Sequence, residues 1–181
     1  MKKNTNNIDK AVFLDRDGVI NIDNNYVNKI EDFEFKDGIF ESLIHLQKLG
    51  YRLFIITNQS GIGRGYYTLQ DFRNLMSWVL KKFEEKNIYI SQIEFCPHHP
   101  NLNCDCRKPK TGMIENILKN YSIDLKNSWL IGDKNSDIQC GINSKIKNTI
   151  LIRPKNSKVE GIIEAKHICI SIKDIKEIIK K

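Results

Sequence analysis

The sequence contains no apolar run that approaches the ~18 residues of a membrane-spanning helix, so no membrane span is expected. Its first ten residues, MKKNTNNIDK, are basic at the start but lack the apolar stretch of a secretory signal peptide, and we expect a cytoplasmic protein. Internal repeats, low-complexity segments and long linkers are also absent. The 181 residues suffice for a substantial core, and we expect a single domain spanning residues 1–181.

Cysteines are few and unevenly placed. There are five, an odd number, and three of them lie between positions 96 and 106. Such crowding argues against the disulfide framework of a small secreted protein and favours metal ligation in a reducing compartment. The other two, Cys140 and Cys169, lie in apolar patterns and are expected to be buried as small hydrophobic residues.

Basic residues outnumber acidic ones and give the chain a formal net charge of +7. This charge fits either a lysine-rich solvated surface or an anionic partner, such as a phosphorylated small molecule or a nucleic acid. No stretch interleaves basic with exposed aromatic residues, and no recognition helix is evident, so we expect no nucleic-acid partner. No exposed apolar stripe is evident either, and we expect a monomer.

Short apolar runs bounded by polar residues predict buried parallel strands. The predicted strands cover residues 11–14, 51–56, 127–131, 148–152 and 167–172. Helical periodicity between the runs predicts helices, with Thr68 and Thr111 as N-caps and Gly50 as a stop. The predicted helices cover residues 38–49, 68–87, 111–121 and 173–180. This alternation predicts an α/β fold whose strands are joined by helical crossovers.

Three of the predicted strands are followed by polar clusters. The strand at 11–14 leads into DRDGV, the strand at 51–56 into TNQSG, and the strand at 127–131 into GDKNSD. Because ligands bind at the carboxyl ends of strands in an open parallel sheet, these clusters should converge. Several carboxylates at one site need a cation, and an all-oxygen set suits Mg²⁺.

The first cluster carries a carboxylate pair. Asp15 and Asp17 lie two residues apart, so both side chains can face the same way at the tip of the strand. One can attack as a nucleophile while the other transfers protons, and Gly18 lets the chain turn sharply after them.

The other clusters add groups that bind phosphate. Thr57 and Asn58 can hold phosphoryl oxygens, and either Lys108 or Lys134 can offset the charge on a transferring group. The assembled parts predict metal-assisted phosphoryl transfer through an aspartyl-phosphate.

The order Asp-x-Asp-Gly-Val, strand-Thr-Asn, Lys-Pro and Gly-Asp-x-x-x-Asp resembles the haloacid dehalogenase superfamily of phosphatases, from residue 11 to about residue 152. The resemblance implies a Rossmann-like three-layer sandwich with a mostly parallel sheet. It also implies the capless type, because only residues 16–37 separate Asp15 from the first predicted helix. Four segments are most similar to the family of D-glycero-D-manno-heptose-1,7-bisphosphate 7-phosphatases: FLDRDGVIN, TNQSGIGRGYY, CPHHP…CDCRKPKTGM and LIGDKNSD.

The resemblance implies a role for each matching residue. Asp15 would attack phosphorus, while Asp17 would protonate the leaving sugar oxygen and later activate water. Thr57 and Lys108 would orient and stabilise the phosphoryl group. Mg²⁺ would be held by Asp133, the Asp15 carboxylate and the backbone carbonyl of Asp17.

Other matching residues would support this site or contact the substrate. Asp137 would support the Mg²⁺ site without binding the ion itself. The implied substrate contacts are Asp23, Asn24, Asn25, Tyr26, Asn58, Gln59, Ser60, Arg107 and Lys134. Residues 60–67, SGIGRGYY, are either a flexible crossover or a substrate loop. Gly63 stands where the resemblance favours alanine, and we expect it to loosen this loop.

The segment 96–106 predicts a second metal site. Cys96-x-His98 followed by Cys104-x-Cys106 offers three thiolates and one imidazole, which select Zn²⁺. Four protein ligands leave no open position, so the zinc would be structural. His99 could replace His98, although the resemblance favours His98. A zinc ion here would fix an irregular loop and hold the two cations that follow it in position.

We therefore expect Mg²⁺-dependent removal of the 7-phosphate of D-glycero-D-manno-heptose 1,7-bisphosphate. This reaction belongs to the biosynthesis of nucleotide-activated heptose, for example for lipopolysaccharide. Histidinol phosphate or a nucleic-acid 3′-phosphate end are alternative substrates for the same mechanism. An alternative of another class is a zinc-stabilised binding module without turnover.

Overall fold

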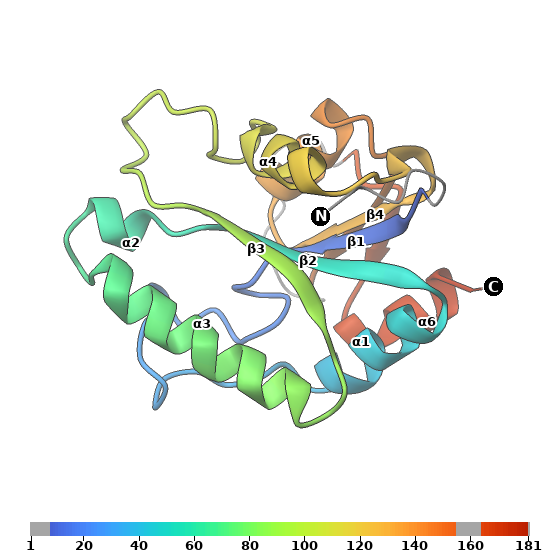
Figure 1. The fold of residues 1–181 in the computed structure, drawn as a ribbon, viewed down its shortest axis with the longest axis horizontal. Helices are drawn as coiled ribbons and strands as arrows, with labels where there is room; N and C mark the ends of the chain where they lie inside the picture. The colour runs from blue at the N-terminus through green and yellow to red at the C-terminus, as the bar shows by residue number, and fades with distance from the viewer. Residues whose placement is uncertain (1–7, 155–163, 181) are drawn as a thin grey trace.

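The computed structural model describes residues 8–154 and 164–180, which form one sheet with helices on both faces (Figure 1). Six strands, all parallel to their neighbours, lie in the order β3-β2-β1-β4-β5-β6. They are β1 (Lys10–Leu14), β2 (Tyr51–Asn58), β3 (Ile90–Cys96), β4 (Trp129–Gly132), β5 (Asn148–Ile152) and β6 (His167–Cys169). None of the described helices is long and apolar enough to cross a bilayer.

The helices complete a three-layer sandwich, as predicted. They are α1 (Ile39–Lys48), α2 (Ser60–Gly63), α3 (Leu69–Glu84), α4 (Gly112–Asn120), α5 (Asn135–Asn143) and α6 (Ile175–Ile178). In Figure 1, α4 and α5 cover one face of the sheet, and α1, α3 and α6 cover the other. The described residues 15–38, between β1 and α1, contain no helix, which agrees with the capless type.

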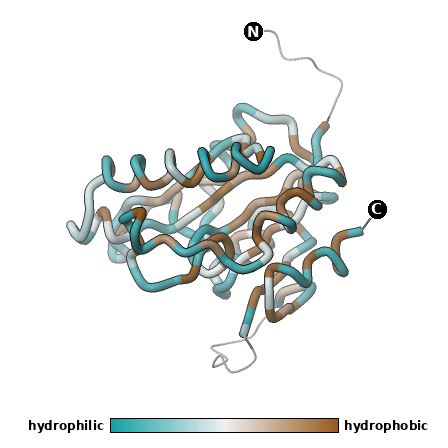
Figure 2. Tube along the Cα trace, turned by 90° about the horizontal axis from the view of Figure 1, so that it is seen from below, coloured by the Kyte–Doolittle hydropathy of each residue, from teal (hydrophilic) through white to brown (hydrophobic). Residues whose placement is uncertain are grey.

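The core has one half on each face of the sheet, because side chains alternate along the strands. In β1, Ala11 and Phe13 pack with α4, whereas Val12 and Leu14 pack with α1 and α3, and all four are fully buried. Burying an aromatic side chain such as Phe13 stabilises the fold by about 2–3 kcal/mol. Figure 2 shows the hydrophobic segments gathered along the strands, with hydrophilic positions recurring along the outer sides of the helices.

The three predicted helix-end residues lie at helix ends, as predicted. The Thr68 hydroxyl accepts from the Asp71 backbone, and the Asp71 carboxylate accepts from the Thr68 backbone, which is a capping box at the start of α3. Gly50 follows α1 with φ 81°. Thr111 is the N-cap residue of α4, as predicted, but its hydroxyl donates to Glu115 Oε1 at 2.6 Å and caps no backbone N–H.

The structure contains one strand that was not predicted, and several predicted boundaries differ. β3 was not predicted, and its pairing with β2 carries β2 on to Asn58. β4 begins at Trp129 because the Asp124 side chain caps a 3₁₀ turn at Leu125–Asn127. β6 ends at Cys169 because Ser171 starts a capped 3₁₀ turn, and this turn shortens the predicted last helix to α6.

Candidate active site

The register of the sheet brings three polar segments to one edge. Leu14, near the end of β1, pairs with Ile55 of β2 on one side and Ile131 of β4 on the other. The Asp15 backbone N–H then donates to the Ile131 carbonyl at 2.9 Å. The residues that follow β1, β2 and β4 therefore leave the sheet at the same edge, as predicted for ligand binding in parallel sheets.

A buried cluster of carboxylates lies at this edge. Ligand oxygens of Asp15, Asp133 and Asp137 all lie within 4.8 Å of one another. Lys108 enters the cluster, with its Nζ 2.8 Å from Asp15 Oδ1 and 2.6 Å from Asp137 Oδ1. A third hydrogen bond, to the Ile56 carbonyl at 2.9 Å, uses the last donor of the ammonium group.

The charges in this cluster perturb one another. Burial raises the pKa of Asp15, although the charge of Lys108 opposes this effect. Burial and the charge of Asp15 raise the pKa of Asp133 to about 8. Burial alone would lower the pKa of Lys108, but the charges of Asp137 and Asp15 outweigh it and raise the pKa, so the amine stays protonated. The cluster holds more carboxylates than one lysine neutralises.

The donor set of this cluster fits Mg²⁺. Asp133 Oδ1 is buried and has no hydrogen-bond partner among the described residues. Both oxygens of Asp137 are engaged, Oδ1 by Lys108 and Oδ2 by the Lys134 backbone N–H at 3.0 Å. This leaves Asp15 and Asp133 to face a cation, which agrees with a supporting role for Asp137. A Cβ at Gly18 would lie 2.2 Å from Asp133 Oδ2, so the close turn there requires glycine.

The Asp17 carboxylate lies in a cage of donors. Arg16, fully buried, donates through Nε at 3.1 Å and through Nη2 at 2.7 and 2.9 Å. Asn21 Nδ2 and Gln59 Nε2 each donate to it at 3.0 Å. Arg16 Nη2 also donates to the Val27 carbonyl at 2.8 Å, which links the cage to the loop after β1. Arg16 and Asn21 were missed from the sequence, although Arg16 stands between two predicted catalytic residues.

At the end of β2, the predicted substrate contacts Asn58 and Gln59 form hydrogen bonds to other residues of the protein. Asn58 Nδ2 donates to the Lys108 carbonyl at 3.2 Å, and Asn58 Oδ1 accepts from the Lys108 backbone N–H at 3.0 Å. Thr57 is buried beside them and accepts from Gln59 Nε2 at 2.8 Å. The structure thus gives Asn58 the task of aligning Lys108, and direct substrate contact by Asn58, Gln59 and Ser60 stays a prediction.

The loop after β1 carries the next group of predicted contacts. Lys134 Nζ lies 3.0 Å from Asp23 Oδ2, so these two predicted residues meet. Burial alone would raise the pKa of Asp23, but its hydrogen bond and charge interaction with Lys134 lower it. Asn25 and Tyr26 both have left-handed backbone, with φ 58° and 53°. Such strain in consecutive non-glycine residues is concentrated at functional loops.

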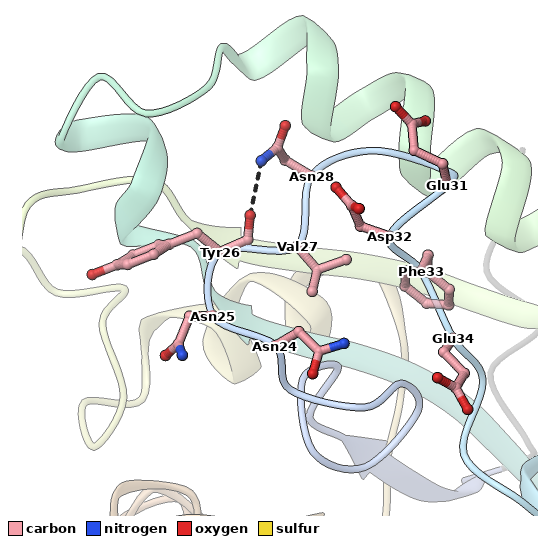
Figure 3. Close-up of a pocket in the computed structure, with 9 residues that line it drawn as sticks. All are labelled: Asn24, Asn25, Tyr26, Val27, Asn28, Glu31, Asp32, Phe33 and Glu34. Carbon is pink, nitrogen blue, oxygen red and sulfur yellow. Dashed lines mark hydrogen bonds between the residues drawn. The ribbon is translucent and has the colours of Figure 1, made fainter.

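Residues of this loop line a cavity of about 770 Å³. Figure 3 shows the side chains that line it. Its lining includes Asn24, Asn25 and Tyr26, together with the carboxylates of Glu31, Asp32 and Glu34. None of the carboxylate cluster lines it. Because its acidic residues would repel a phosphate, we place the reacting phosphoryl group at Lys108 and not in this cavity.

The predicted zinc ligands also meet. Ligand atoms of Cys96, His98, Cys104 and Cys106 lie within 4.8 Å of one another. The Cys96 and Cys104 sulfurs are 3.5 Å apart, and His98 Nδ1 is 3.2 Å from Cys106 Sγ. His99 instead accepts from the Asn101 backbone N–H at 3.2 Å, so the structure places His98 in the cluster. Three thiolates and one imidazole at these separations fit a tetrahedral Zn²⁺ site.

The expectation that Gly63 loosens its loop is wrong. A Cβ at Gly63 would lie 2.3 Å from the His99 backbone nitrogen and 2.8 Å from the Pro97 carbonyl oxygen. The missing side chain therefore lets α2 pack directly against the backbone of the segment 96–106, which we call the cysteine-rich loop. Alanine at this position would push the two segments apart.

Arg107 precedes Lys108, and both follow the cysteine-rich loop directly. Arg107 Nη1 is buried without a hydrogen-bond partner among the described residues, which suits an incoming anion. Arg107 and Lys108 line a cavity of about 380 Å³ with residues of the cysteine-rich loop.

Known proteins share this sequence along most of its length. A family model described as polynucleotide kinase 3 phosphatase matches residues 10–160. A D-glycero-beta-D-manno-heptose-1,7-bisphosphate 7-phosphatase of Helicobacter pylori is 48% identical over 174 residues, 96% of this chain and 97% of that protein. The chain belongs to the D-glycero-manno-heptose-1,7-bisphosphate 7-phosphatase family. A D-glycero-alpha-D-manno-heptose-1,7-bisphosphate 7-phosphatase of Campylobacter jejuni is 52% identical over 152 residues, 84% of this chain and 86% of that protein.

Solved structures of the family agree with the fold. D,D-heptose 1,7-bisphosphate phosphatase from B. bronchiseptica, complexed with magnesium and phosphate, superposes with a TM-score of 0.83 at 26% identity, covering 93% of this chain and 96% of that chain. Membership in a family of phosphatases makes the chain a phosphoric monoester hydrolase, as predicted. The alternative of a non-catalytic zinc-stabilised binding module loses its support.

Proposed function

We propose that this chain is a Mg²⁺-dependent phosphatase that removes the 7-phosphate of D-glycero-D-manno-heptose 1,7-bisphosphate, in the biosynthesis of nucleotide-activated heptose. The observation that carries the proposal is the buried contact of Asp15 with Lys108, 2.8 Å apart, beside Asp133. The relatives are named for this substrate in both anomeric forms, so both belong in its tests.

The proposed reaction has two steps. In the first step, a carboxylate oxygen of Asp15 attacks phosphorus and forms an Asp15 O–P bond. The bond between phosphorus and the oxygen on C7 breaks, and Asp17 gives its proton to that oxygen. A water molecule then attacks the same phosphorus while Asp17 takes its proton. This step breaks the Asp15 O–P bond and releases inorganic phosphate.

The surrounding residues stabilise charge during both steps. Asp133, the Asp15 carboxylate and the Asp17 backbone carbonyl would hold Mg²⁺, which supplies neutralisation of the nucleophile and the phosphoryl oxygens. Lys108 and Thr57 stabilise the phosphoryl group. The remaining substrate contacts in this proposal are Asp23, Asn24, Asn25, Tyr26, Asn58, Gln59, Ser60, Arg107 and Lys134.

The cysteine-rich loop would support this site through structural zinc. Zinc bound by Cys96, His98, Cys104 and Cys106 would hold Arg107 and Lys108 in position before substrate arrives. Asn58 adds a second constraint from β2, through its two hydrogen bonds to the Lys108 backbone. We also propose that the chain is a single domain, a monomer and cytoplasmic. Light scattering on the purified chain tests whether it is a monomer.

A panel of phosphomonoesters tests the proposal. Initial rates are measured on both anomers of the heptose bisphosphate, histidinol phosphate and fructose 1,6-bisphosphate, with Mg²⁺ or with EDTA. We expect a strong preference in kcat/KM for the heptose bisphosphate and no turnover with EDTA. A preference for histidinol phosphate, or full activity in EDTA, would contradict the proposal.

A nucleic-acid 3′-phosphate end is the second candidate substrate, because the matching family model is described as polynucleotide kinase 3 phosphatase. A 3′-phosphorylated oligonucleotide in the same panel tests it. Hydrolysis of this oligonucleotide with a steep salt dependence would favour this candidate over the sugar.

A further inference from the structure

The amide of Gln59 connects the Asp17 cage to the end of β2. Gln59 is almost completely buried, with 2% of its surface exposed, and its backbone N–H donates to the Cys96 carbonyl at 2.8 Å. Its side-chain Nε2 donates to Asp17 Oδ2 at 3.0 Å and to Thr57 Oγ1 at 2.8 Å. Both donors of this NH₂ group therefore serve residues with proposed roles in phosphoryl transfer.

The opposite end of the amide is held by Tyr67. The Tyr67 hydroxyl donates to Gln59 Oε1 at 2.6 Å. If the amide were reversed, its carbonyl oxygen would face the Asp17 carboxylate and its NH₂ group would face a hydroxyl group. Two acceptors would then oppose each other in a buried site. The Tyr67 hydroxyl favours the orientation that gives Asp17 a donor.

The sequence around Tyr67 serves this contact. The α2 turn brings the chain back, so that Tyr67 lies over Gly61, where a Cβ would lie 2.1 Å from the tyrosine ring. Tyr67 is 7% exposed, and burial raises the pKa of its hydroxyl to about 12. The hydroxyl is therefore a permanent donor at neutral pH. The neighbouring Tyr66 is 59% exposed and contacts Tyr26 edge-to-face, so the two tyrosines have different surroundings.

We propose that Tyr67 is a positioning residue for proton transfer at Asp17: it holds the Gln59 amide with its NH₂ group toward Asp17 and Thr57. The proposal rests on the proposed function, in which Asp17 protonates the leaving oxygen. Without the Tyr67 hydroxyl, Gln59 Oε1 loses its hydrogen bond and the amide is held less firmly, so Asp17 is held less firmly in its direction. Tyr67 itself touches neither substrate nor Asp17 in this role.

The chemistry of the leaving group separates this role from a purely structural one. A sugar alkoxide is a poor leaving group and needs the proton of Asp17, whereas p-nitrophenolate leaves without protonation. A misdirected Asp17 should therefore lower kcat/KM, which reports the steps up to departure of the leaving group, far more for alkyl phosphates than for p-nitrophenyl phosphate. General damage to the fold or to Mg²⁺ binding would slow both substrates alike.

The test compares Tyr67→Phe with the unmodified chain on both substrates, using any alkyl phosphomonoester that the chain hydrolyses. We expect kcat/KM on the alkyl phosphate to fall about tenfold, a fraction of the ~10²–10⁴ that a general acid contributes. The expected change in kcat/KM on p-nitrophenyl phosphate is below about twofold. Tyr121→Phe is the matched control, because its hydroxyl donates to the Ser91 carbonyl at 2.7 Å elsewhere in the fold.

A second variant tests the route through the amide. Gln59→Met removes both ends of the link and also the hydrogen bond to Thr57. It should therefore lower kcat/KM on both substrates, and more on the alkyl phosphate than on p-nitrophenyl phosphate. Combining it with Tyr67→Phe should cause no further loss, because both changes act through one side chain. Equal losses on the two substrates, a Tyr121→Phe variant with the same signature, or additive losses in the double variant would each overturn the proposal. If the unmodified chain preferred a substrate other than the heptose bisphosphate, the proposed function would be contradicted. The comparison of Tyr67→Phe with the unmodified chain on the two substrates would still hold.

Discussion

The carboxylate cluster of Asp15, Asp133 and Asp137 and the zinc-ligand cluster of residues 96–106 are built in opposite ways. The carboxylates come from segments far apart in the sequence, and the register of β1 and β4 brings them together. The zinc ligands come from one short segment, which starts with Cys96 at the end of β3 and continues through the loop that follows. One cluster depends on the whole sheet, and the other depends on local spacing.

The two clusters also differ in what holds them together without a metal. In the carboxylate cluster, Lys108 bridges Asp15 and Asp137 in the buried interior, and Asn58 aligns the Lys108 backbone. The loop of the zinc-ligand cluster is irregular, and Cys104 and Cys106 are only partly buried. We infer that loss of Mg²⁺ would cost activity with the fold kept, whereas loss of zinc would cost order in the loop.

Removal of the nucleophile should give the largest effect and should leave the other cluster untouched. We expect Asp15→Asn to lower kcat at least about 10³-fold, because an amide cannot form the acyl phosphate. Phosphate release measures the loss, while circular dichroism and zinc per chain should match the unmodified protein. Residual turnover within about tenfold of normal would remove Asp15 from the mechanism.

Lys108→Met should affect both activity and stability, because it leaves two buried carboxylates facing each other. We expect kcat to fall about 10²-fold. Breaking a buried ion pair also costs about 3–5 kcal/mol in the free energy of unfolding, measured by urea titration without added Mg²⁺.

Lys110→Met is the matched control, since this exposed lysine lies two residues further and pairs with the exposed Asp105. If the two variants unfold at the same urea concentration, Lys108 does not hold the carboxylate cluster together.

Cys104→Ala tests whether the zinc-ligand cluster serves the carboxylate cluster. We expect loss of bound zinc and a fall in kcat/KM of about tenfold, because the loop no longer holds Arg107 and Lys108 in position. Cys169→Ala, at a buried cysteine in β6, should keep its zinc. A zinc-free Cys104→Ala variant with normal turnover and substrate affinity would show that the two clusters are independent.

The same contrast explains what could be predicted from the sequence. The zinc-ligand cluster is visible from spacing alone, since all its ligands lie between Cys96 and Cys106. The carboxylate cluster could be predicted only from three strand ends taken together, using the rule that ligands bind at the carboxyl edge of a parallel sheet. Both predictions depend on regular features, which short sequence patterns encode.

The missed features depend on contacts between loops. β3 was not recognised because its residues are half-buried and its register with β2 shifts beside Leu53, which breaks the two-residue period. The role of Gly63 depends on the backbone of another loop, and the Tyr67–Gln59 contact depends on the path of α2. No periodicity in one segment can predict such contacts.

Asp133→Asn should change stability with the opposite sign to Lys108→Met. The pKa of Asp133 is raised to about 8 in the folded chain, so folding favours the neutral form of this carboxyl group. The stability that the neutral form contributes is complete below the unfolded value near 3.8 and is lost as pH rises through about 8. Without metal, the variant should therefore unfold at a higher temperature than the unmodified chain. We expect its free energy of unfolding to be greater by roughly 1 kcal/mol or more, and this difference should be larger at high pH. The same change removes an oxygen that faces the cation and should abolish stabilisation by added Mg²⁺. Thermal unfolding with and without Mg²⁺ across this pH range measures both effects. A variant that is less stable than the metal-free chain throughout the range would show that Asp133 is held by contacts other than a cation.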